Sequence, residues 1–146
     1  METLNRRNAE EGTEMEHRVY VYGSLRVGEP NHGVLARHDA QFIAAREISG
    51  YLMHAYCASF PAVYASHDLQ YGKIVVEEYA VSDACLRDLD RLEGHPAFYR
   101  RIRTIGGAWI YVMREERVKR VGAPRVFGGD WVRYRDRVEL NAGGGA

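Results

Sequence analysis

The chain has 146 residues, 46% of them hydrophobic, which is enough for one domain with its own core. Its 20 Lys and Arg residues balance its 20 Asp and Glu residues, so no overall electrostatic field favours a nucleic acid or an acidic membrane surface. We therefore expect neither a nucleic acid nor a membrane as partner, and no apolar run approaches the length of a membrane span.

The cysteines indicate the cellular compartment, and the two ends of the chain indicate the domain boundaries. Cys57 and Cys85 have no metal-ligand spacing and give no disulfide framework, which favours a cytoplasmic protein without a metal. The N-terminus is polar and lacks a signal peptide's apolar stretch, and the C-terminus is rich in glycine. We expect a single domain at 17–138 between disordered tails at 1–16 and 139–146.

The first half of the chain predicts strands. Residues 18–24 form a β-branched and aromatic run closed by Gly23, typical of a buried strand, and the turn residues after it lead to a possible helical turn at 34–38. Residues 41–55 predict two strand pieces with a kink at Gly50. Residues 59–66 are expected to form a loop with aromatic anchors, and 72–81 is the clearest strand.

The second half predicts one helix followed by a hairpin. Ser82 is a helix cap, and an apolar stripe at helical spacing follows it, formed by Cys85, Leu86, Leu89 and Leu92. Gly94 suits the left-handed position after a helix end. A β-hairpin is expected around Gly106-Gly107, and residues 116–131 are expected to be loop-like. Strands with one or two helices indicate an α+β domain.

Glu93 is the main candidate for chemistry. It lies in the last turn of the predicted helix, where the macrodipole is negative, and Asp90 lies one turn earlier. Both effects, together with desolvation in a pocket, would raise the pKa of the Glu93 carboxyl toward neutrality. A carboxyl group of that kind can move a proton, and the glycine turn after the first strand can hold a small polar ligand through its backbone.

Three motifs in order resemble the γ-glutamylcyclotransferase-like family, in particular its γ-glutamylamine cyclotransferase and butirosin-pathway branch. They read Tyr-Gly-Ser-Leu at 22–25, Pro-Asn-His at 30–32 and Leu-Glu-Gly-His-Pro-Ala-Phe-Tyr-Arg-Arg at 92–101, with Gly-Gly-Asp-Trp at 128–131 as a further similarity. The resemblance covers residues 18–134. It implies a small mixed β-barrel with one or two flanking helices and a ligand site in its mouth.

The resemblance also implies a reaction. In this family a γ-glutamyl group closes on itself to give 5-oxoproline and a free amine, without a cofactor or a metal. The implied acid/base is Glu93. The implied substrate-binding residues are Tyr22, Gly23, Ser24, Leu25 and Tyr99, and Asn31, His32 and Arg101 are further candidates.

Several interpretations stay open. Tyr99 could equally fill the core, a structural role is favoured for His32, and the arginines at 100, 101 and 103 either alternate along a strand or line the mouth. Residues 116–131 and 57–70 could shape the pocket for a particular amine, and Trp109 and Trp131 are expected to be packing residues. Ser24 lacks the sequence context of a nucleophilic serine.

The alternatives in function are a binding module that turns nothing over, and different chemistry on a nucleotide-like ligand. The partner is expected to be a small molecule. The sequence does not distinguish a monomer from a homodimer, and it does not name the leaving amine.

Overall fold

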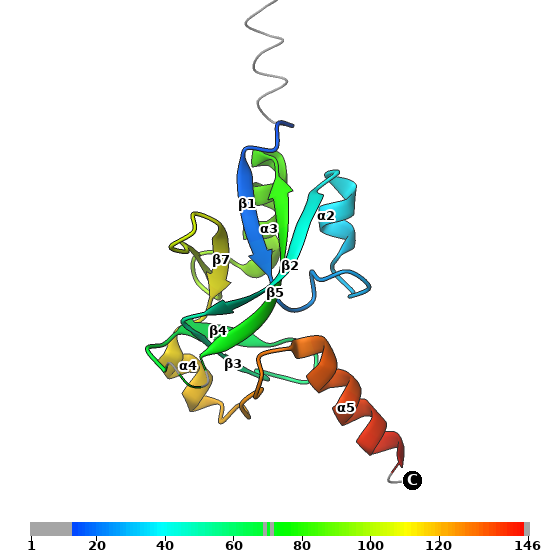
Figure 1. The fold of residues 1–146 in the computed structure, drawn as a ribbon, viewed down its shortest axis with the longest axis vertical. Coiled ribbons are helices and arrows are strands. Elements are labelled where there is room, and N and C mark those ends of the chain that lie inside the picture. Colours follow the sequence, from blue (N-terminus) through cyan, green and yellow to red (C-terminus); the bar gives the residue numbers. More distant parts are fainter. Residues whose placement is uncertain (1–12, 69, 71, 145–146) are drawn as a thin grey trace, which may run out of the picture.

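The computed structural model describes residues 13–68, 70 and 72–144, and Figure 1 shows their arrangement. A five-stranded sheet has the order β2-β5-β1-β7-β6, and a two-stranded sheet pairs β3 with β4. The only parallel pair among these described strands is β1 with β7. The strands are β1 (His17–Val21), β2 (Gln41–Ser49), β3 (Tyr51–His54), β4 (Ala62–Ala65), β5 (Lys73–Val81), β6 (Arg100–Arg103) and β7 (Trp109–Val112).

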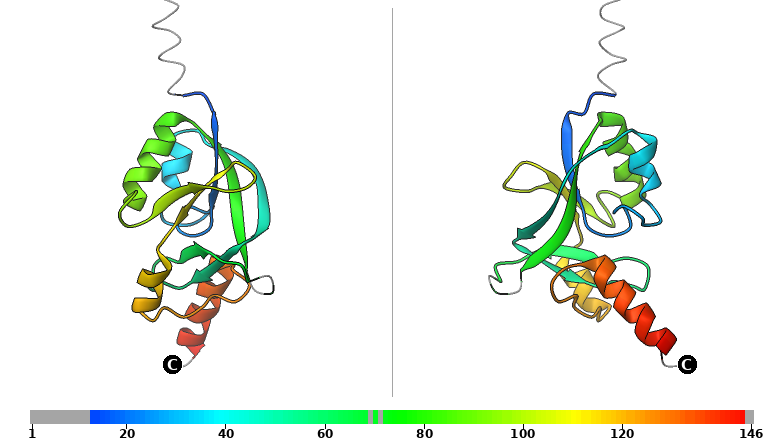
Figure 2. Two further views of the ribbon diagram at one scale, coloured as in Figure 1. Left: turned by 90° about the vertical axis from the view of Figure 1, so that its left-hand side faces the viewer. Right: turned by 45° about the vertical axis from the view of Figure 1, so that its right-hand side comes forward.

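Backbone hydrogen bonds connect the two sheets at two places. The Met113 amide, just after β7, donates to the Val63 carbonyl of β4 at 2.9 Å, and the Gly50 amide donates to the Gly72 carbonyl at 2.7 Å. Gly50 has φ 98°, and it separates β2 from β3 as the sequence predicted. With the helices lying on the outside of the sheets (Figure 2), the predicted α+β class is confirmed.

The main helix, α3 (Asp83–Glu93), begins and ends as predicted. The Ser82 side chain accepts a hydrogen bond from the Cys85 amide at 3.1 Å, and Gly94 closes the helix with φ 66°. Cys85, Leu86 and Leu89 are buried. Leu92, the last member of the expected apolar stripe, is 42% exposed, because the final turn of the helix reaches the rim of a cavity.

Two segments expected to be loops contain regular structure. Within 59–66, strand β4 pairs with β3 in the register Met53↔Val63, so hydrogen bonding to a distant strand decides the conformation of this segment. Within 116–131, helix α4 (Glu115–Arg120) ends before Gly122, which has φ 66°. The hairpin of β6 and β7 around Gly106-Gly107 is confirmed.

Two further helices complete the fold, α2 (Gly33–Arg37) and α5 (Trp131–Gly144). Trp131, 1% exposed, fixes the start of α5 in the core, as expected of a packing residue. Helix α5 crosses the domain boundary expected at residue 138, so the backbone of the expected tail is helical as far as Gly144. Of the expected N-terminal tail, 1–12 lie outside the described residues. None of the described helices is long and apolar enough to cross a bilayer.

The buried side chains form two groups, one on the side of α2 and α3 and one reaching the small sheet. The first includes Leu35, Leu89 and Met113, and the second includes Met53 and Ile74. Two carboxylates of β5 are also buried and are paired with arginines. Glu78 binds Arg18 and Arg46, and Glu77 binds Arg26.

Candidate active site

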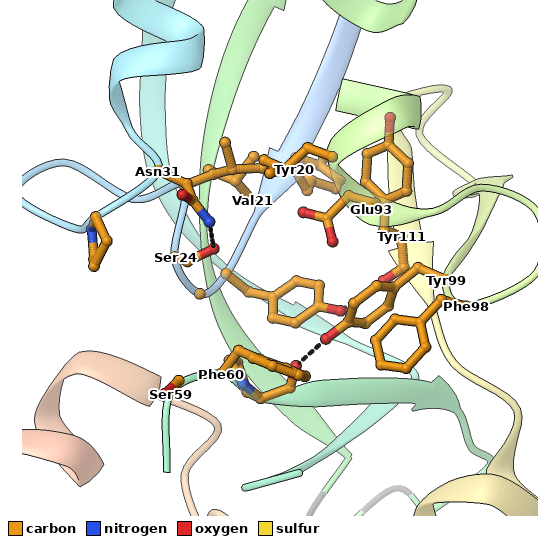
Figure 3. A pocket seen from close by; sticks show the side chains of 16 residues that line it. Tyr20, Val21, Ser24, Asn31, Ser59, Phe60, Glu93, Phe98, Tyr99 and Tyr111 are labelled. Carbon is orange, nitrogen blue, oxygen red and sulfur yellow. Dashed lines mark hydrogen bonds between the residues drawn. The ribbon is translucent and has the colours of Figure 1, made fainter. Parts of the chain in front are cut away.

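A cavity of about 430 Å³ opens between the end of β1, the end of α3 and the segment that leads into β4. Its volume lies in the range of small-molecule sites, roughly 300–1,000 Å³. Of the residues expected to form a site, the cavity is lined by Tyr22, Gly23, Ser24, Leu25, Asn31, Glu93 and Tyr99. The tertiary structure therefore brings the glycine turn and the helix-end carboxylate, which are far apart in the sequence, to one space (Figure 3).

Glu93 is the last residue of α3, and its carboxylate projects into this cavity (Figure 3). It is the only Asp, Glu, Lys, Arg or His side chain among the described residues that line the cavity. Burial raises the pKa of the Glu93 carboxyl to about 7. No described side chain or backbone group forms a hydrogen bond or ion pair with that carboxylate, so it is free to exchange a proton with a ligand.

The contribution expected from Asp90 is absent, because Asp90 is occupied elsewhere. Its carboxylate accepts bonds from Arg101 at 2.8 and 3.0 Å and from the Tyr111 hydroxyl at 2.7 Å. Partial burial alone would raise the pKa of Asp90, but the bonds to Arg101 and Tyr111 outweigh it, so the pKa is lowered. Desolvation, rather than repulsion from Asp90, is therefore the cause of the raised Glu93 pKa.

The turn after β1 is held by its own hydrogen bonds. The Asn31 amide donates to the Ser24 carbonyl at 2.8 Å, and the Asn31 side chain donates to Ser24 Oγ at 2.9 Å. Among the described residues, no acceptor is found for the backbone N–H groups of Gly23, Ser24 and Leu25. Consecutive free N–H groups at the wall of a cavity form a natural binding place for a carboxylate.

The structure gives a further reason for glycine at position 23, besides the approach to a ligand that its sequence context predicts. A side chain at this position would place Cβ only 2.8 Å from Pro61 Cδ and 2.9 Å from Cγ. The close approach is thus to Pro61, which lies just before β4, and not only to a ligand. Pro61 and the turn together define one side of the cavity.

Both tyrosines of the expected site use their hydroxyls to fix the wall. Tyr22 donates to the Tyr111 carbonyl at 2.7 Å, and Tyr99 donates to the Pro61 carbonyl at 2.6 Å. Burial, with the neighbouring Glu93 charge as a smaller cause, raises the pKa of both phenols, so both remain protonated. Tyr99 therefore has both roles that the sequence left open, since it is buried and also lines the cavity.

Two of the further candidates do not line the cavity. His32 Nδ1 lies 2.9 Å from the Leu25 carbonyl and its ring packs near Tyr79, so it supports the turn from behind. Arg101 binds Asp90 and stacks on Trp109, 4.1 Å from the ring centroid. Arg103 also lies over Trp109, and residues 116–131 contribute nothing to the lining.

The sequence argument missed most of the aromatic lining. The cavity is lined by the aromatic residues Phe60, Phe98, Tyr20 and Tyr111, and also by Ser59. Residues 57–70 are a candidate pocket-shaping loop in the sequence, and Ser59, Phe60 and Pro61 of this segment do line the cavity. Nothing in the local pattern singles out Phe60, because its place in the lining depends on where the segment before β4 lies in the fold. Phe98 lies inside the motif that contains Glu93, and its position there was the available signal.

A group of metal-ligand type lies outside the cavity. Ligand atoms of Glu16, His17 and Asp83 lie within 4.8 Å of one another where β1 and α3 begin. His17 Nε2 forms a hydrogen bond with the Asp83 carboxylate. None of these three side chains lines the cavity.

The family model described as γ-glutamyl cyclotransferase, AIG2-like, matches residues 19–133, which include every element from the end of β1 to the start of α5. The chain belongs to this family. It is accordingly an enzyme of the cyclotransferase type. The resemblance predicted from the three motifs is confirmed.

Relatives within the family agree with this assignment. A Vibrio cholerae protein named as a γ-glutamylcyclotransferase is 39% identical over 106 residues, covering 69% of this chain and 85% of the relative. Human γ-glutamylaminecyclotransferase is 39% identical over 92 residues, which are 57% of each chain. The crystal structure of an uncharacterised Pyrococcus horikoshii protein matches with a TM-score of 0.62 at 25% identity, covering 87% of this chain and 96% of that protein.

Proposed function

We propose that this enzyme converts a γ-glutamyl amide into 5-oxoproline and a free amine, with Glu93 carrying the proton. The observation that carries the proposal is the isolated Glu93 carboxyl in the cavity, whose pKa is raised to about 7 by burial. A general acid/base works best when its pKa lies near the working pH, and such a group typically contributes about 10²–10⁴-fold to the rate.

The free N–H groups of the turn support a binding mode for the substrate. In this proposal the amides of Gly23, Ser24 and Leu25 donate to the α-carboxylate of the glutamyl group. The substrate is thereby held with its α-amino group near Glu93, folded back toward its own side-chain carbonyl. Holding a reactive conformer of this kind corresponds to effective molarities of ~10⁵–10⁸ M, so positioning outweighs the proton transfer.

The reaction balances without a metal or a cofactor. The α-ammonium loses one proton to the Glu93 carboxylate and attacks the γ-carbonyl, so a bond forms between nitrogen and carbon. The tetrahedral centre then loses a second proton to the medium and expels the amine, which takes the proton held by Glu93. The γ-amide bond breaks, and 5-oxoproline and the amine leave.

The nucleotide-like alternative receives no support from the cavity. Binding of phosphate groups calls for cationic side chains or a helix N-terminus. No Lys or Arg is among the described residues that line the cavity, and the helix that reaches it presents its C-terminal end.

The test is release of 5-oxoproline from a panel of γ-glutamyl compounds by the native protein and by Glu93→Gln. We expect turnover by the native protein and a loss of about 10²-fold or more in kcat for the variant, since Gln cannot carry a proton. Glu116→Gln, which changes an exposed carboxylate that does not line the cavity, is the matched control. Equal turnover by Glu93→Gln and the native protein would overturn the mechanism, and binding without product would favour the binding module.

A further inference from the structure

One side of the cavity is an aromatic wall, which we define as Phe60, Phe98 and Tyr99. The rings of Phe60 and Phe98 lie 6.1 Å apart with an interplanar angle of 76°, and Phe98 and Tyr99 lie 5.2 Å apart at 84°. Tyr56 packs against both phenylalanines from outside the lining. Edge-to-face contacts of this kind fix the rings in place, so the wall is pre-formed.

The aromatic wall and the free N–H groups lie on different parts of the lining. The turn at 23–25 follows β1, whereas Phe98 and Tyr99 follow α3 and Phe60 precedes β4. Figure 3 shows Phe60, Phe98 and Tyr99 on the side of the cavity away from Val21 and Asn31. A γ-glutamyl group whose carboxylate is bound at the turn therefore directs its amide substituent toward the rings.

No cationic group is available on the wall for a second carboxylate. Arg117 lies 5.3 Å from the Phe98 ring centroid, but its guanidinium donates to the Ala97 and Phe98 carbonyls, both at 3.4 Å, and it is not part of the lining. Arg101 is bound to Asp90. A carboxylate placed here would lose its water without gaining a partner, and it would lie in the same cavity as Glu93.

We propose that the aromatic wall selects γ-glutamyl amides whose amide substituent is uncharged and apolar, above all aromatic, over γ-glutamyl amino acids, whose substituent carries a carboxylate. This inference rests on the proposed function and names its substrate class. Phe60 and Phe98 are the residues that determine the preference. The described lining offers no cationic side chain, and in this proposal the glutamyl α-carboxylate uses the free N–H groups of the turn.

The experiment compares γ-glutamylbenzylamide, γ-glutamylethylamide and γ-glutamylglycine. Because a phenyl ring buries more apolar surface than an ethyl group, we expect kcat/KM for the benzylamide to exceed that for the ethylamide by roughly tenfold or more. We expect γ-glutamylglycine to lie below the ethylamide, because its carboxylate finds no cationic partner in the described lining.

Substitutions in the aromatic wall test whether it causes the preference for the benzylamide. In Phe60→Leu and Phe98→Leu the ratio of kcat/KM between benzylamide and ethylamide should fall toward one, whatever the absolute activity of each variant. Phe42→Leu is the matched control, since Phe42 is 59% exposed, packs on Tyr79 and does not line the cavity, and it should keep the native ratio.

Calorimetric binding of the same compounds to Glu93→Gln separates this inference from the mechanism. Tighter binding of the benzylamide supports the aromatic wall even if no compound yields 5-oxoproline, a result that would overturn the proposed function alone. Equal binding and equal turnover of benzylamide and ethylamide would overturn the inference while the cyclisation stands. A preference for the glycine compound would also overturn it.

Discussion

At the scale of single residues, Glu93, the proposed acid/base, has a cost in stability. A buried carboxylate without a partner is destabilised in its charged form, which is why the pKa of Glu93 is raised to about 7 from the ordinary 4.5. The same desolvation that prepares the group to exchange protons near neutral pH therefore disfavours folding whenever the group is ionised. Neighbouring Asp90 shows the opposite case, because bonds to Arg101 and Tyr111 stabilise its charge.

Stability should thus depend on pH through Glu93. Below pH 4.5 the group is protonated in both states, and its contribution to stability is fully present. As the pH rises to about 7, the folded protein retains a proton that the unfolded chain has lost, so stability falls until both states are ionised. Between acidic and mildly alkaline pH, the free energy of unfolding of Glu93→Gln should rise by about 3 kcal/mol relative to that of the native protein.

Urea unfolding across this pH range measures the difference in free energy of unfolding between the two proteins. Glu116→Gln, at an exposed position, should show a nearly constant difference from the native protein. A pH-independent difference for Glu93→Gln would show that the Glu93 carboxyl titrates normally in the folded state.

At the scale of elements, the cavity depends on the contact between the turn after β1 and the segment before β4. Pro61 packs against Gly23 and accepts the Tyr99 hydroxyl bond through its carbonyl. The cavity is therefore shaped by contacts among three segments that are distant in sequence. The pairing of β3 with β4 holds Pro61 in place.

Gly23→Ala tests this contact. The new Cβ would lie 2.8 Å from Pro61 Cδ, so the turn must move and its free N–H groups lose their position. We expect kcat/KM to fall roughly tenfold or more, since small displacements of positioning groups are costly in rate.

Gly33→Ala is the matched control for the turn variant. A Cβ at Gly33 meets nothing within 4 Å, and the position begins helix α2, so activity should stay near the native value. Native-like kinetics of Gly23→Ala would mean that the turn tolerates displacement and does not position the substrate.

At the scale of the whole molecule, Arg26 connects the turn to the sheet and to the start of α5. Its guanidinium donates to Glu77 of β5 at 3.1 Å and to Asp130 at 2.9 Å, and the Val27 amide also donates to Glu77 at 2.9 Å. Glu77 is 6% exposed, so its charge depends on these partners. The Gly-Gly-Asp-Trp motif therefore contacts Arg26, next to the turn, through Asp130, without lining the cavity.

Arg26→Met should destabilise the protein by about 3–5 kcal/mol, because a buried carboxylate is left without its cation. Thermal or urea unfolding measures this loss. Arg91→Met, which removes an exposed partner of Asp88, should cost no more than about 1 kcal/mol. Combining Arg26→Met with Glu77→Gln should recover part of the loss, and a double variant as unstable as the single one would show that the charge of Glu77 is not the cause.

The sequence by itself determined the local features that depend on neighbours in the chain. The Ser82 cap, the Gly94 helix end and the break at Gly50 all follow from backbone preferences acting over a few residues. The motif order also led to the family, and it named Glu93 and the turn at 22–25, which the cavity brings together. Neither β4 nor α4 was predicted, since their local patterns are weak.

Only the tertiary structure decided what surrounds Glu93 and why its pKa is raised. Asp90 lies one helical turn away in sequence, yet Arg101 and Tyr111, from β6 and β7, neutralise its influence. Phe60 lines the cavity from the segment just before β4, and Pro61 in the same segment lies close to Gly23. Desolvation and aromatic packing arise from elements that meet only in the folded chain, so no local pattern could supply them.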